Sequence, residues 1–405
     1  MSNASTLLWP LRRSPALDWF VRSSFDYPYL DDLFADLCHR LAEDGLPIAR
    51  ATLHARGLHP QFIGAAMVWR DGGRPIEMRM ITRADIESAQ FHNSPIKALY
   101  EGAGGVRQRL DLPPVGQEFG IYADLRADGF TDYVAMPLVG SDGRRHAVTF
   151  ATRRPGGFAT DDLIIFDDLL PLLAMAAEAR IGRRITKTIL ETYVGKEAGL
   201  QILAGNIRRG AHEVIDAAVW VADLAHFSEL ADHAPRDEVL GVLDTFFDAM
   251  GQPIQRHGGE ILKFMGDAVM SVFRLDRPDA VPRALAAARE AYRNLEEIGA
   301  MRRAGGSEPL GYGLGLHLGQ VIYGNIGTEN RLDFTVIGPA VNEAARMERL
   351  SRTLGRHVVI SDVFAAAAKG EELIPLGQHQ LRGRELPIEL FGLPEEEGNP
   401  WSYVV

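Results

Sequence analysis

Apolar residues recur with helical spacing near the start of the chain. Between residues 29 and 56 they follow one another three or four positions apart, which puts them on one face of a helix. These residues are Leu30, Leu33, Phe34, Leu37 and Leu41. Two strand-like runs follow, at residues 61–69 (QFIGAAMVW) and 75–81 (PIEMRMI). A helix followed by strands predicts an α+β domain.

A hairpin is predicted from the next pair of apolar runs. Residues 133–139 (YVAMPLV) and 146–152 (HAVTFAT) are rich in residues that favour strands. Between them, residues 141–145 read SDGRR, which offers the turn chemistry that a hairpin needs.

A long helix is predicted after the hairpin. Thr160 can cap its first turn, and Asp161 and Asp162 suit the positive end of the helix dipole. Pro171 either kinks the helix or starts a second segment. The apolar stripe expected on its buried face consists of Leu163, Phe166, Leu169 and Leu170.

Two strands, a tight turn, the sequence FATDDL and a long closing helix together resemble GAF domains. The resemblance covers roughly residues 25–180 and implies a sensory or dimerisation domain at 1–180. Because GAF domains usually bind small ligands or dimerise, we expect a small-molecule ligand in this domain. The sequence does not identify that ligand.

A linker helix is predicted at residues 181–213. Its apolar positions stand near helical spacing between charged residues, at Ile185, Ile189, Tyr193 and Val194. Two interpretations remain open. Either the helix pairs with its twin in a second chain and connects sensor to output, or it is a solvated helix that packs on its own domain.

The first candidate for chemistry is an aspartate at the end of a strand. Residues 217–222 are wholly apolar, as in a strand buried on both faces, and Asp223 ends the run. A single aspartate at such a place is more often a turn or cap residue than a ligand.

A second carboxylate in the sequence favours a metal-binding role for Asp223 over a turn or cap role. Two short apolar runs flank residues 265–268 (MGDA), so a hairpin would carry Asp267 at its tip. Two carboxylates at neighbouring strand ends can hold two divalent cations such as magnesium or manganese. For Asp267 alone, an ordinary Gly-Asp hairpin turn remains the alternative.

A third motif joins a strand to a helix. Residues 333–352 (DFTVIGPAVNEAARMERLSR) pass through a Gly-Pro turn into a helix on which Asn342 and Arg346 share one face. An amide and a guanidinium there can bind ribose and phosphate oxygens. A solvated or ion-paired helix surface is the alternative interpretation.

Taken together, these three motifs closely resemble the class III adenylyl and guanylyl cyclases, over roughly residues 214–395. The resemblance implies that Asp223 and Asp267 bind the metal ions and that Asn342 and Arg346 contact the transition state. It also implies a ferredoxin-like catalytic domain, so the fold class expected for the whole chain is α+β.

The resemblance also assigns the residues that select the base. The lysine three positions before the hairpin glycine corresponds to Lys263, and its partner seven positions before Asn342 corresponds to Thr335. Adenylyl cyclases usually have aspartate at the second position, but threonine is typical of a known adenylyl subclass. Its hydroxyl can accept a hydrogen bond from adenine N6. Guanylyl cyclases usually carry glutamate and a small residue there.

Two further stretches match the family. Within residues 379–393 (HQLRGRELPIELFGL), Arg382, or alternatively Arg384, corresponds to the basic residue that holds the terminal phosphates. Residues 313–327 resemble the strand-turn-strand that precedes the helix motif, and their glycines predict tight turns and close backbone approaches. We expect His317 within this stretch to be structural.

The mechanism implied by the resemblance needs a homodimer. Two domains pair head to tail, and each site takes two Mg²⁺ or Mn²⁺ ions from one chain and its base, Asn and Arg contacts from the other. The substrate is ATP and the products are cyclic AMP and pyrophosphate. The alternatives are a catalytically silent nucleotide-binding regulator and a guanylyl cyclase that uses GTP. A diguanylate cyclase is disfavoured because its acidic hairpin signature is absent.

Composition limits the classes of partner and the location that we expect for this protein. The 405 residues carry a formal net charge of −11, which does not favour binding to nucleic acid or to anionic lipid. No apolar run reaches the roughly 18 residues that a membrane span needs, so we expect a cytoplasmic protein. The single cysteine, Cys38, cannot form an intrachain disulfide and is expected to be a small buried side chain.

Overall fold

The computed structural model describes residues 9–57, 62–72, 75–114, 116 and 118–396. The chain divides into two compact units, Met1–Ile189 and Leu190–Val405, and each is described by itself. Both units combine helices with a sheet, which is antiparallel in the N-terminal unit and antiparallel except for one parallel strand pair in the C-terminal unit, so the predicted α+β class is confirmed. No described helix is long and apolar enough to cross a membrane.

The N-terminal unit is built on a six-stranded antiparallel sheet with strand order β3-β2-β1-β6-β5-β4. Its strands are β1 (Arg50–Arg56), β2 (Gly64–Arg70), β3 (Glu77–Ile81), β4 (Val106–Arg109), β5 (Asp132–Val139) and β6 (Arg145–Thr152). Its helices are α1 (Pro15–Ser23), the short 3-10 helix η1 (Ser24–Asp26), α2 (Leu30–Glu43), α3 (Arg83–Glu87), α4 (Ala89–His92), α5 (Pro95–Tyr100), α6 (Ile121–Ala127) and α7 (Thr160–Val194).

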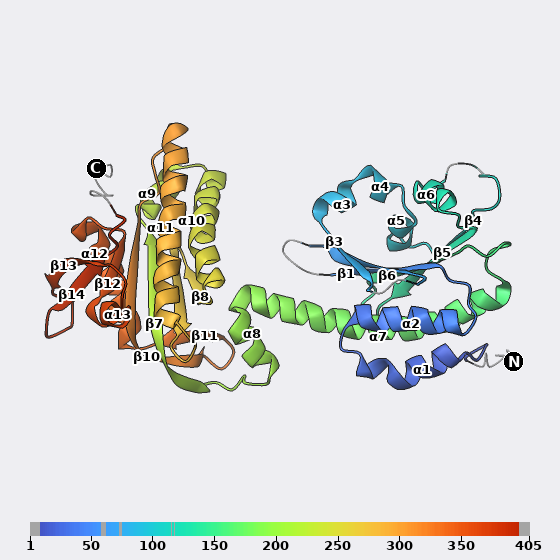
Figure 1. The fold of residues 1–405 in the computed structure, drawn as a ribbon, viewed down its shortest axis with the longest axis horizontal. Coiled ribbons are helices and arrows are strands. Elements are labelled where there is room, and N and C mark those ends of the chain that lie inside the picture. Colours follow the sequence, from blue (N-terminus) through green and yellow to red (C-terminus); the bar gives the residue numbers. More distant parts are fainter. Residues whose placement is uncertain (1–8, 58–61, 73–74, 115, 117, 397–405) are drawn as a thin grey trace. The chain divides into compact units, whose positions relative to one another are not determined.

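Helices cover both faces of this sheet (Figure 1). The larger core joins the sheet to α1, α2 and α7, and fully buried Phe34, Phe150 and Phe166 lie in it. A smaller core joins the opposite face to α5 and α6 through residues such as Leu99 and Tyr122. Cys38 is fully buried, as expected. Each face of the sheet therefore has its own apolar core.

Several predicted elements are confirmed, and one boundary is wrong. Strands β5 and β6 form the expected hairpin, and Phe166 and Leu169 lie buried on the helix that follows it. The helical pattern of residues 29–56 extends too far, because α2 ends at Glu43 and residues 50–56 form β1. Gly45, which has a φ of 91°, and Pro47 end the helix. Gln61, in the first predicted strand run, lies outside the described residues.

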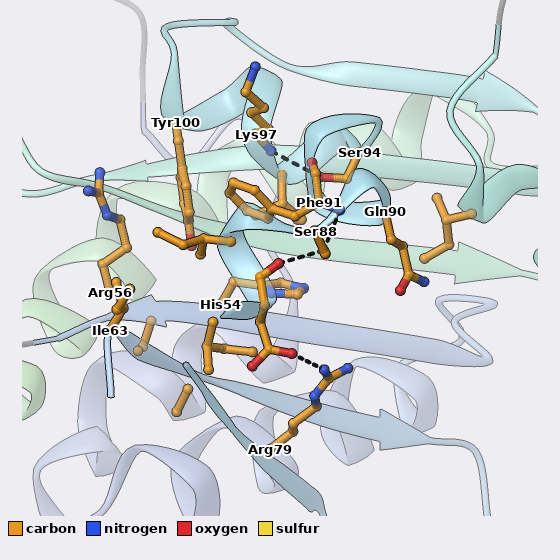
Figure 2. Close-up of a pocket in the computed structure, with 18 of the residues that line it drawn as sticks. His54, Arg56, Ile63, Arg79, Ser88, Gln90, Phe91, Ser94, Lys97 and Tyr100 are labelled. Carbon is orange, nitrogen blue, oxygen red and sulfur yellow. Dashed lines mark hydrogen bonds and ion pairs between the residues drawn. The ribbon is translucent and has the colours of Figure 1, made fainter. Parts of the chain in front are cut away.

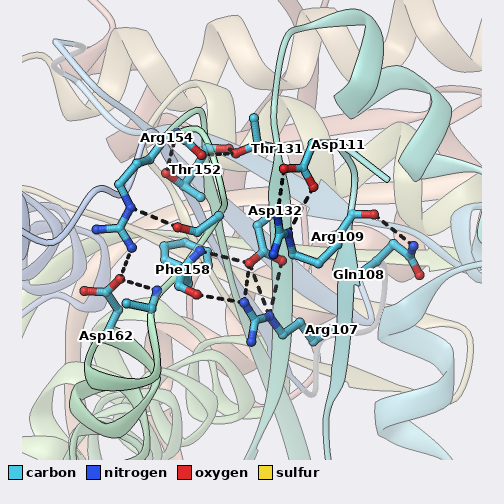
Figure 3. Close-up of polar contacts among 12 residues, drawn as sticks. Arg107, Gln108, Arg109, Asp111, Thr131, Asp132, Thr152, Arg154, Phe158 and Asp162 are labelled. Atoms are coloured by element: carbon cyan, nitrogen blue, oxygen red, sulfur yellow. Dashed lines mark hydrogen bonds and ion pairs between the residues drawn. The ribbon is translucent and has the colours of Figure 1, made fainter. Parts of the chain in front are cut away.

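A buried carboxylate ties the start of α7 to the sheet (Figure 3). Asp132 of β5 is completely buried, and its Oδ2 accepts hydrogen bonds from Arg107 Nη2 at 2.7 Å and from the Phe158 backbone N–H at 2.9 Å. Asp162 accepts from the Ala159 backbone N–H at 2.7 Å and from Arg154. Asp162 therefore satisfies the backbone at the start of α7, where Thr160 was expected to act as the cap.

The predicted linker is interrupted. Helix α7 continues through Pro171 to Val194 and stops there because Gly195 adopts a φ of 92°, a conformation that favours glycine. A short helix, α8 (Lys196–Leu203), follows, and the next strand begins at His212. The segment from 181 to 213 therefore contains the end of α7, the helix α8, a connecting loop and the first two residues of β7.

The C-terminal unit contains an eight-stranded sheet with order β13-β14-β12-β10-β7-β9-β8, and β11 pairs with β10. Its strands are β7 (His212–Leu224), β8 (Glu260–Met265), β9 (Ala268–Arg274), β10 (Tyr312–Gly327), β11 (Leu332–Ile337), β12 (Val358–Ser361), β13 (Ile374–His379) and β14 (Ile388–Gly392). Its helices after α8 are α9 (Phe227–His233), α10 (Arg236–Arg256), α11 (Ala280–Ala304), α12 (Pro339–Leu354) and α13 (Asp362–Ala367).

Two apolar cores hold this unit together. On one face of the sheet, Trp220 and Phe273 pack with α10 and α11. On the other face, Val219 and Val321 pack with Ala340 and Ala344 of α12. Figure 1 shows α10 and α11 side by side along the sheet. The central strand β7 is thus buried on both faces, as its unbroken apolar run predicted.

The strand-turn-strand expected at residues 313–327 is wrong. These residues form one long strand, β10, which pairs with the whole of β7 from Tyr312 to Gly324. Its glycines serve the other predicted role, close backbone approach. A Cβ on Gly315 would lie 2.1 Å from the carbonyl oxygen of Ala344, so glycine lets α12 pack directly on the strand.

Candidate active site

The two candidate metal-binding aspartates lie next to each other. Asp223 is near the end of β7, and Asp267 follows Gly266 in the turn between β8 and β9, as the predicted hairpin requires. Gly266 has a φ of 69°, which permits this tight turn. Because β7 pairs with β9, Asp223 stands opposite Ala268, the residue after Asp267.

The electrostatics at this point favour a cation. Burial and, as a smaller effect, the negative charge of Asp267 together raise the pKa of Asp223 to about 6. Asp223 Oδ1 is buried and has no hydrogen-bond partner within the described chain. An orphaned carboxylate oxygen beside a second carboxylate matches the oxygen ligands that magnesium and manganese prefer.

The two aspartates would leave most of a cation's coordination to other ligands. Among the described residues, no group of three or more His, Cys, Asp or Glu side chains is arranged to hold a metal ion. A hard divalent cation takes about six oxygen ligands, so substrate phosphate and water would have to supply the rest. This donor set fits a metal that is bound together with a nucleotide.

Glu348 is a third acidic residue near this pair, and the sequence did not reveal it. Burial raises its pKa to about 7, and the charge of Asp223 acts in the same direction. It reaches this place because Gly313, opposite Asp223, has no side chain. A Cβ there would lie 2.6 Å from Glu348 Oε1. Only the packing of α12 on β10 could have indicated this.

The two candidate base-selecting residues lie on strands that face each other. Lys263 on β8 has its Nζ 3.5 Å from the carboxylate of Asp333 on β11. Thr335 lies two residues further along β11, on the same face of the strand. Its Oγ1 is buried and has no partner in the described structure. Sequence reasoning missed Asp333, although the alternation of side chains along a strand places it with Thr335.

Asn342 and Arg346 lie one turn apart on α12, which begins after Gly338. The Asn342 side chain is exposed, and Arg346 is half-buried. A Cβ on Gly383 would lie 3.5 Å from Arg346 Nη2, so the guanidinium rests against the loop between β13 and β14. That loop also carries both candidate phosphate-binding arginines.

The two candidate phosphate-binding arginines differ in their contacts. Arg384 Nη1 donates to Glu343 Oε2 at 2.9 Å. Arg382 is exposed, and no ion pair involves it among the residues that the structure describes. His317 Nε2 lies 3.4 Å from the same Glu343, and burial lowers the pKa of this histidine. Arg382 is therefore the arginine whose charge is free to meet a ligand.

Within one chain the candidate residues fall into three groups. They are the acidic group of Asp223, Asp267 and Glu348, the base group of Lys263, Asp333 and Thr335, and the helix group of Asn342, Arg346, Arg382 and Arg384. Across the described ranges, no hydrogen bond or ion pair joins one group to another. Direct polar contacts within one chain therefore do not join the three groups to one another.

The family comparison bears on the unit that carries these groups. Residues 211–393 match the family model of the adenylate and guanylate cyclase catalytic domain. The C-terminal unit contains a class III nucleotide cyclase domain. The N-terminal unit is an α+β domain whose family is unassigned. The cyclase family typically uses divalent metals and dimerises.

Three similar proteins illustrate the match. The uncharacterized protein Rv1319c of Mycobacterium tuberculosis is 32% identical over 240 residues, which are 56% of this chain and 43% of that protein. The chain thus spans less than half the length of this relative. A bacterial light-regulated adenylyl cyclase structure is 29% identical, with a TM-score of 0.41 over 47% of this chain and 94% of its own. The guanylyl cyclase Cya2 is also 29% identical, with a TM-score of 0.40 over 46% and 98%.

Proposed function

We propose that this protein is an adenylyl cyclase, which converts ATP to 3′,5′-cyclic AMP and pyrophosphate in a homodimer. The observation that carries the proposal is the adjacent pair Asp223 and Asp267, with a buried and unpartnered Asp223 oxygen, in a nucleotide cyclase domain. A catalytically silent relative has no need to keep such a costly pair of carboxylates.

The base group supports adenine as the base. Lys263 can donate to adenine N1, which is an acceptor, whereas the corresponding atom of guanine carries a hydrogen. The unpartnered hydroxyl of Thr335 can accept from adenine N6. Because Asp333 lies 3.5 Å from Lys263, its charge would hold the ammonium group in place near Thr335.

The remaining residues have roles that follow from their chemistry. Asp223 and Asp267 would hold divalent metal ions, which make the ribose 3′-hydroxyl more acidic and neutralise the leaving pyrophosphate. Asn342 would orient the ribose. Arg346 would stabilise the charge that develops on the α-phosphate oxygens, and Arg382 would hold the terminal phosphates.

A homodimer would bring the three groups together. Each chain has one copy of every group, so head-to-tail pairing of two chains yields two equal sites. We further propose that the N-terminal unit is a GAF-like regulator that acts through α7 and α8. A ligand there can change activity only if it binds the competent and incompetent dimers unequally.

The deciding experiment is product formation by the purified full chain. It is incubated with ATP or GTP and with manganese or magnesium, and the cyclic nucleotide is quantified. Cyclic AMP from ATP is expected, with Asp267→Ala lower by about 100- to 1,000-fold. Asp244→Ala, which removes an exposed carboxylate from α10, is the matched control and should retain activity.

Each other outcome has a definite meaning. Full activity in Asp267→Ala would remove the metal-binding assignment. Preference for GTP would overturn the roles of Lys263 and Thr335. If the intact chain forms neither cyclic AMP nor cyclic GMP, the protein is better explained as a catalytically silent regulator.

A further inference from the structure

The N-terminal unit contains a cavity that the proposed catalytic function does not use. It has a volume of about 750 Å³ and lies between strands β1 to β3 and helices α3 to α5 (Figure 2). Small-molecule sites in proteins typically enclose about 300–1,000 Å³. The cavity is therefore large enough for a metabolite of ordinary size.

The floor of the cavity is polar, whereas the other face of the same strand is apolar. Side chains alternate along β1, so the cavity side carries Arg50, Thr52, His54 and Arg56. Thr52 Oγ1 lies 3.0 Å from His54 Nε2 and 2.6 Å from Thr149 Oγ1. Burial lowers the pKa of His54 to about 4, so at neutral pH the ring is uncharged. A neutral imidazole offers a ligand one donor or one acceptor.

The charges around the cavity do not balance. Four basic side chains line it, Arg50, Arg56, Arg79 and Lys97, against two acidic ones, Asp85 and Glu101. Arg79 pairs with Asp85, and Lys97 Nζ lies 3.1 Å from Glu101. Neither of the other two basic side chains, on β1, forms an ion pair with a described residue. The cavity thus retains two positive charges.

Arg50 is the more costly of these two cations. Burial lowers its pKa, because a charged group loses solvation when it is withdrawn from water. Its positive charge also lowers the pKa of His54. An anion bound beside Arg50 would restore the lost solvation, and the neighbouring imidazole could donate a further hydrogen bond to it.

The helical side of the cavity carries two aromatic rings. Figure 2 shows Tyr100, Phe91 and Gln90 along this side, opposite His54 on the sheet. The rings of Phe91 and Tyr100 have centroids 6.3 Å apart, and the Arg56 guanidinium lies 5.0 Å from the Tyr100 centroid. Such surfaces favour a flat ring.

The serines on the same side are already engaged. Ser88 Oγ accepts from the Phe91 backbone N–H, and Ser94 Oγ accepts from the Lys97 backbone N–H, so both cap short helices. Each hydroxyl also donates to a backbone carbonyl. Both serine hydroxyls have therefore already used their single donor.

We propose that this cavity binds a small organic anion with a flat apolar body, whose acidic group lies at Arg50 and His54 and whose ring packs against Phe91 and Tyr100. Binding depends on this unit alone. It can therefore be tested without reference to catalysis, and its failure would leave the proposed cyclase activity untouched.

The test compares two probes of similar shape and different charge. Anilinonaphthalene sulfonate is a flat organic anion, and N-phenyl-1-naphthylamine is its neutral counterpart. Fluorescence titrations are run on the intact chain and on Arg50→Gln, Arg50→Lys and Arg144→Gln. Arg144 lies in the exposed turn between β5 and β6 and does not line the cavity, so its variant controls for the change in net charge.

We expect Arg50→Gln to weaken binding of the sulfonate about tenfold or more and to leave binding of the neutral amine within about twofold. Arg50→Lys, which keeps the charge, should retain most of the affinity, and Arg144→Gln should retain all of it. An equal loss for both probes in Arg50→Gln would overturn the proposal. So would sulfonate binding that excess ATP displaces and that the Arg50 variants leave unchanged.

Discussion

The hydroxyl of Tyr323 on β10 lies 2.9 and 2.8 Å from the two carboxylate oxygens of Glu260, the first residue of β8. Burial raises the pKa of Glu260, and the backbone N–H of Ala198 in α8 also donates to it. The end of the linker is thereby attached to the strand that carries Lys263. This contact offers a direct path from α8 to the base group.

We predict that Tyr323→Phe destabilises the catalytic unit by about 1–3 kcal/mol, because it leaves a half-buried carboxylate with an unmet hydrogen bond. Urea unfolding followed by circular dichroism measures the change. Tyr29→Phe is the matched control, since Tyr29 is 60% exposed, and its unfolding curve should not move. If Tyr323→Phe and Tyr29→Phe unfold at the same urea concentration, the contact of Tyr323 with Glu260 contributes nothing to the stability of the catalytic unit.

The proposed dimer predicts complementation between inactive variants. Asp267→Ala and Arg346→Ala should each lack activity, but they damage opposite halves of a shared site. An equal mixture allowed to exchange subunits should recover about one quarter of the activity of the unmodified chain, because half of the dimers then contain one intact site. Cyclic AMP formation measures this. A mixture no more active than its components would mean that each site lies within one chain.

Base selection gives a third prediction. Lys263→Glu replaces a donor by an acceptor, so it should lower turnover of ATP and raise the ratio of GTP to ATP turnover. Competition between the two nucleotides in one reaction measures the ratio directly. Lys187→Glu, which makes the same charge change in α7, is the control. An unchanged ratio in Lys263→Glu would place the base elsewhere.

The buried carboxylate at the start of α7 predicts a large stability effect. Asp132→Ala should destabilise the N-terminal unit by about 3–5 kcal/mol, because Arg107 loses its partner and the Phe158 N–H loses its acceptor. The exposed pair of Asp111 with Arg109, 2.7 Å apart, is the comparison, and Asp111→Ala should cost less than about 1 kcal/mol. If Asp132→Ala and Asp111→Ala lower the free energy of unfolding in urea by similar amounts, the structural role of Asp132 is wrong.

His54 predicts how acid affects the N-terminal unit. Its pKa falls from 6.5 to about 4 on folding, so between these values the unfolded chain binds more protons than the folded one. Stability should therefore decline as the pH drops from 6.5 toward 4 and level off below 4. Melting temperatures measured across this pH range test the decline in stability. The decline should be smaller in His54→Gln. A variant as acid-sensitive as the original chain would exclude His54 as the cause.

Local patterns in the sequence were sufficient for much of the fold. An unbroken apolar run predicted a strand buried on both faces, with Asp223 near its end, and the Gly-Asp turn predicted the hairpin that carries Asp267. Asn342 and Arg346 followed from helical periodicity. These features depend on residues a few positions apart, where spacing alone determines which side chains share a face.

Tertiary structure decided what depends on packing between distant segments. The glycines of residues 313–327 predicted turns, but β7 pairs with β10 along its length and keeps it extended, while α12 needs the space that the glycines leave. For the same reason only the fold placed Glu348 beside Asp223. It also converted the alternating residues of β1 into the charged floor of a cavity, because helices α3 to α5 leave a space above that face. The spacing of residues along a chain determines on which face of a helix or strand a side chain lies. Only the packed structure determines which other residues that side chain contacts.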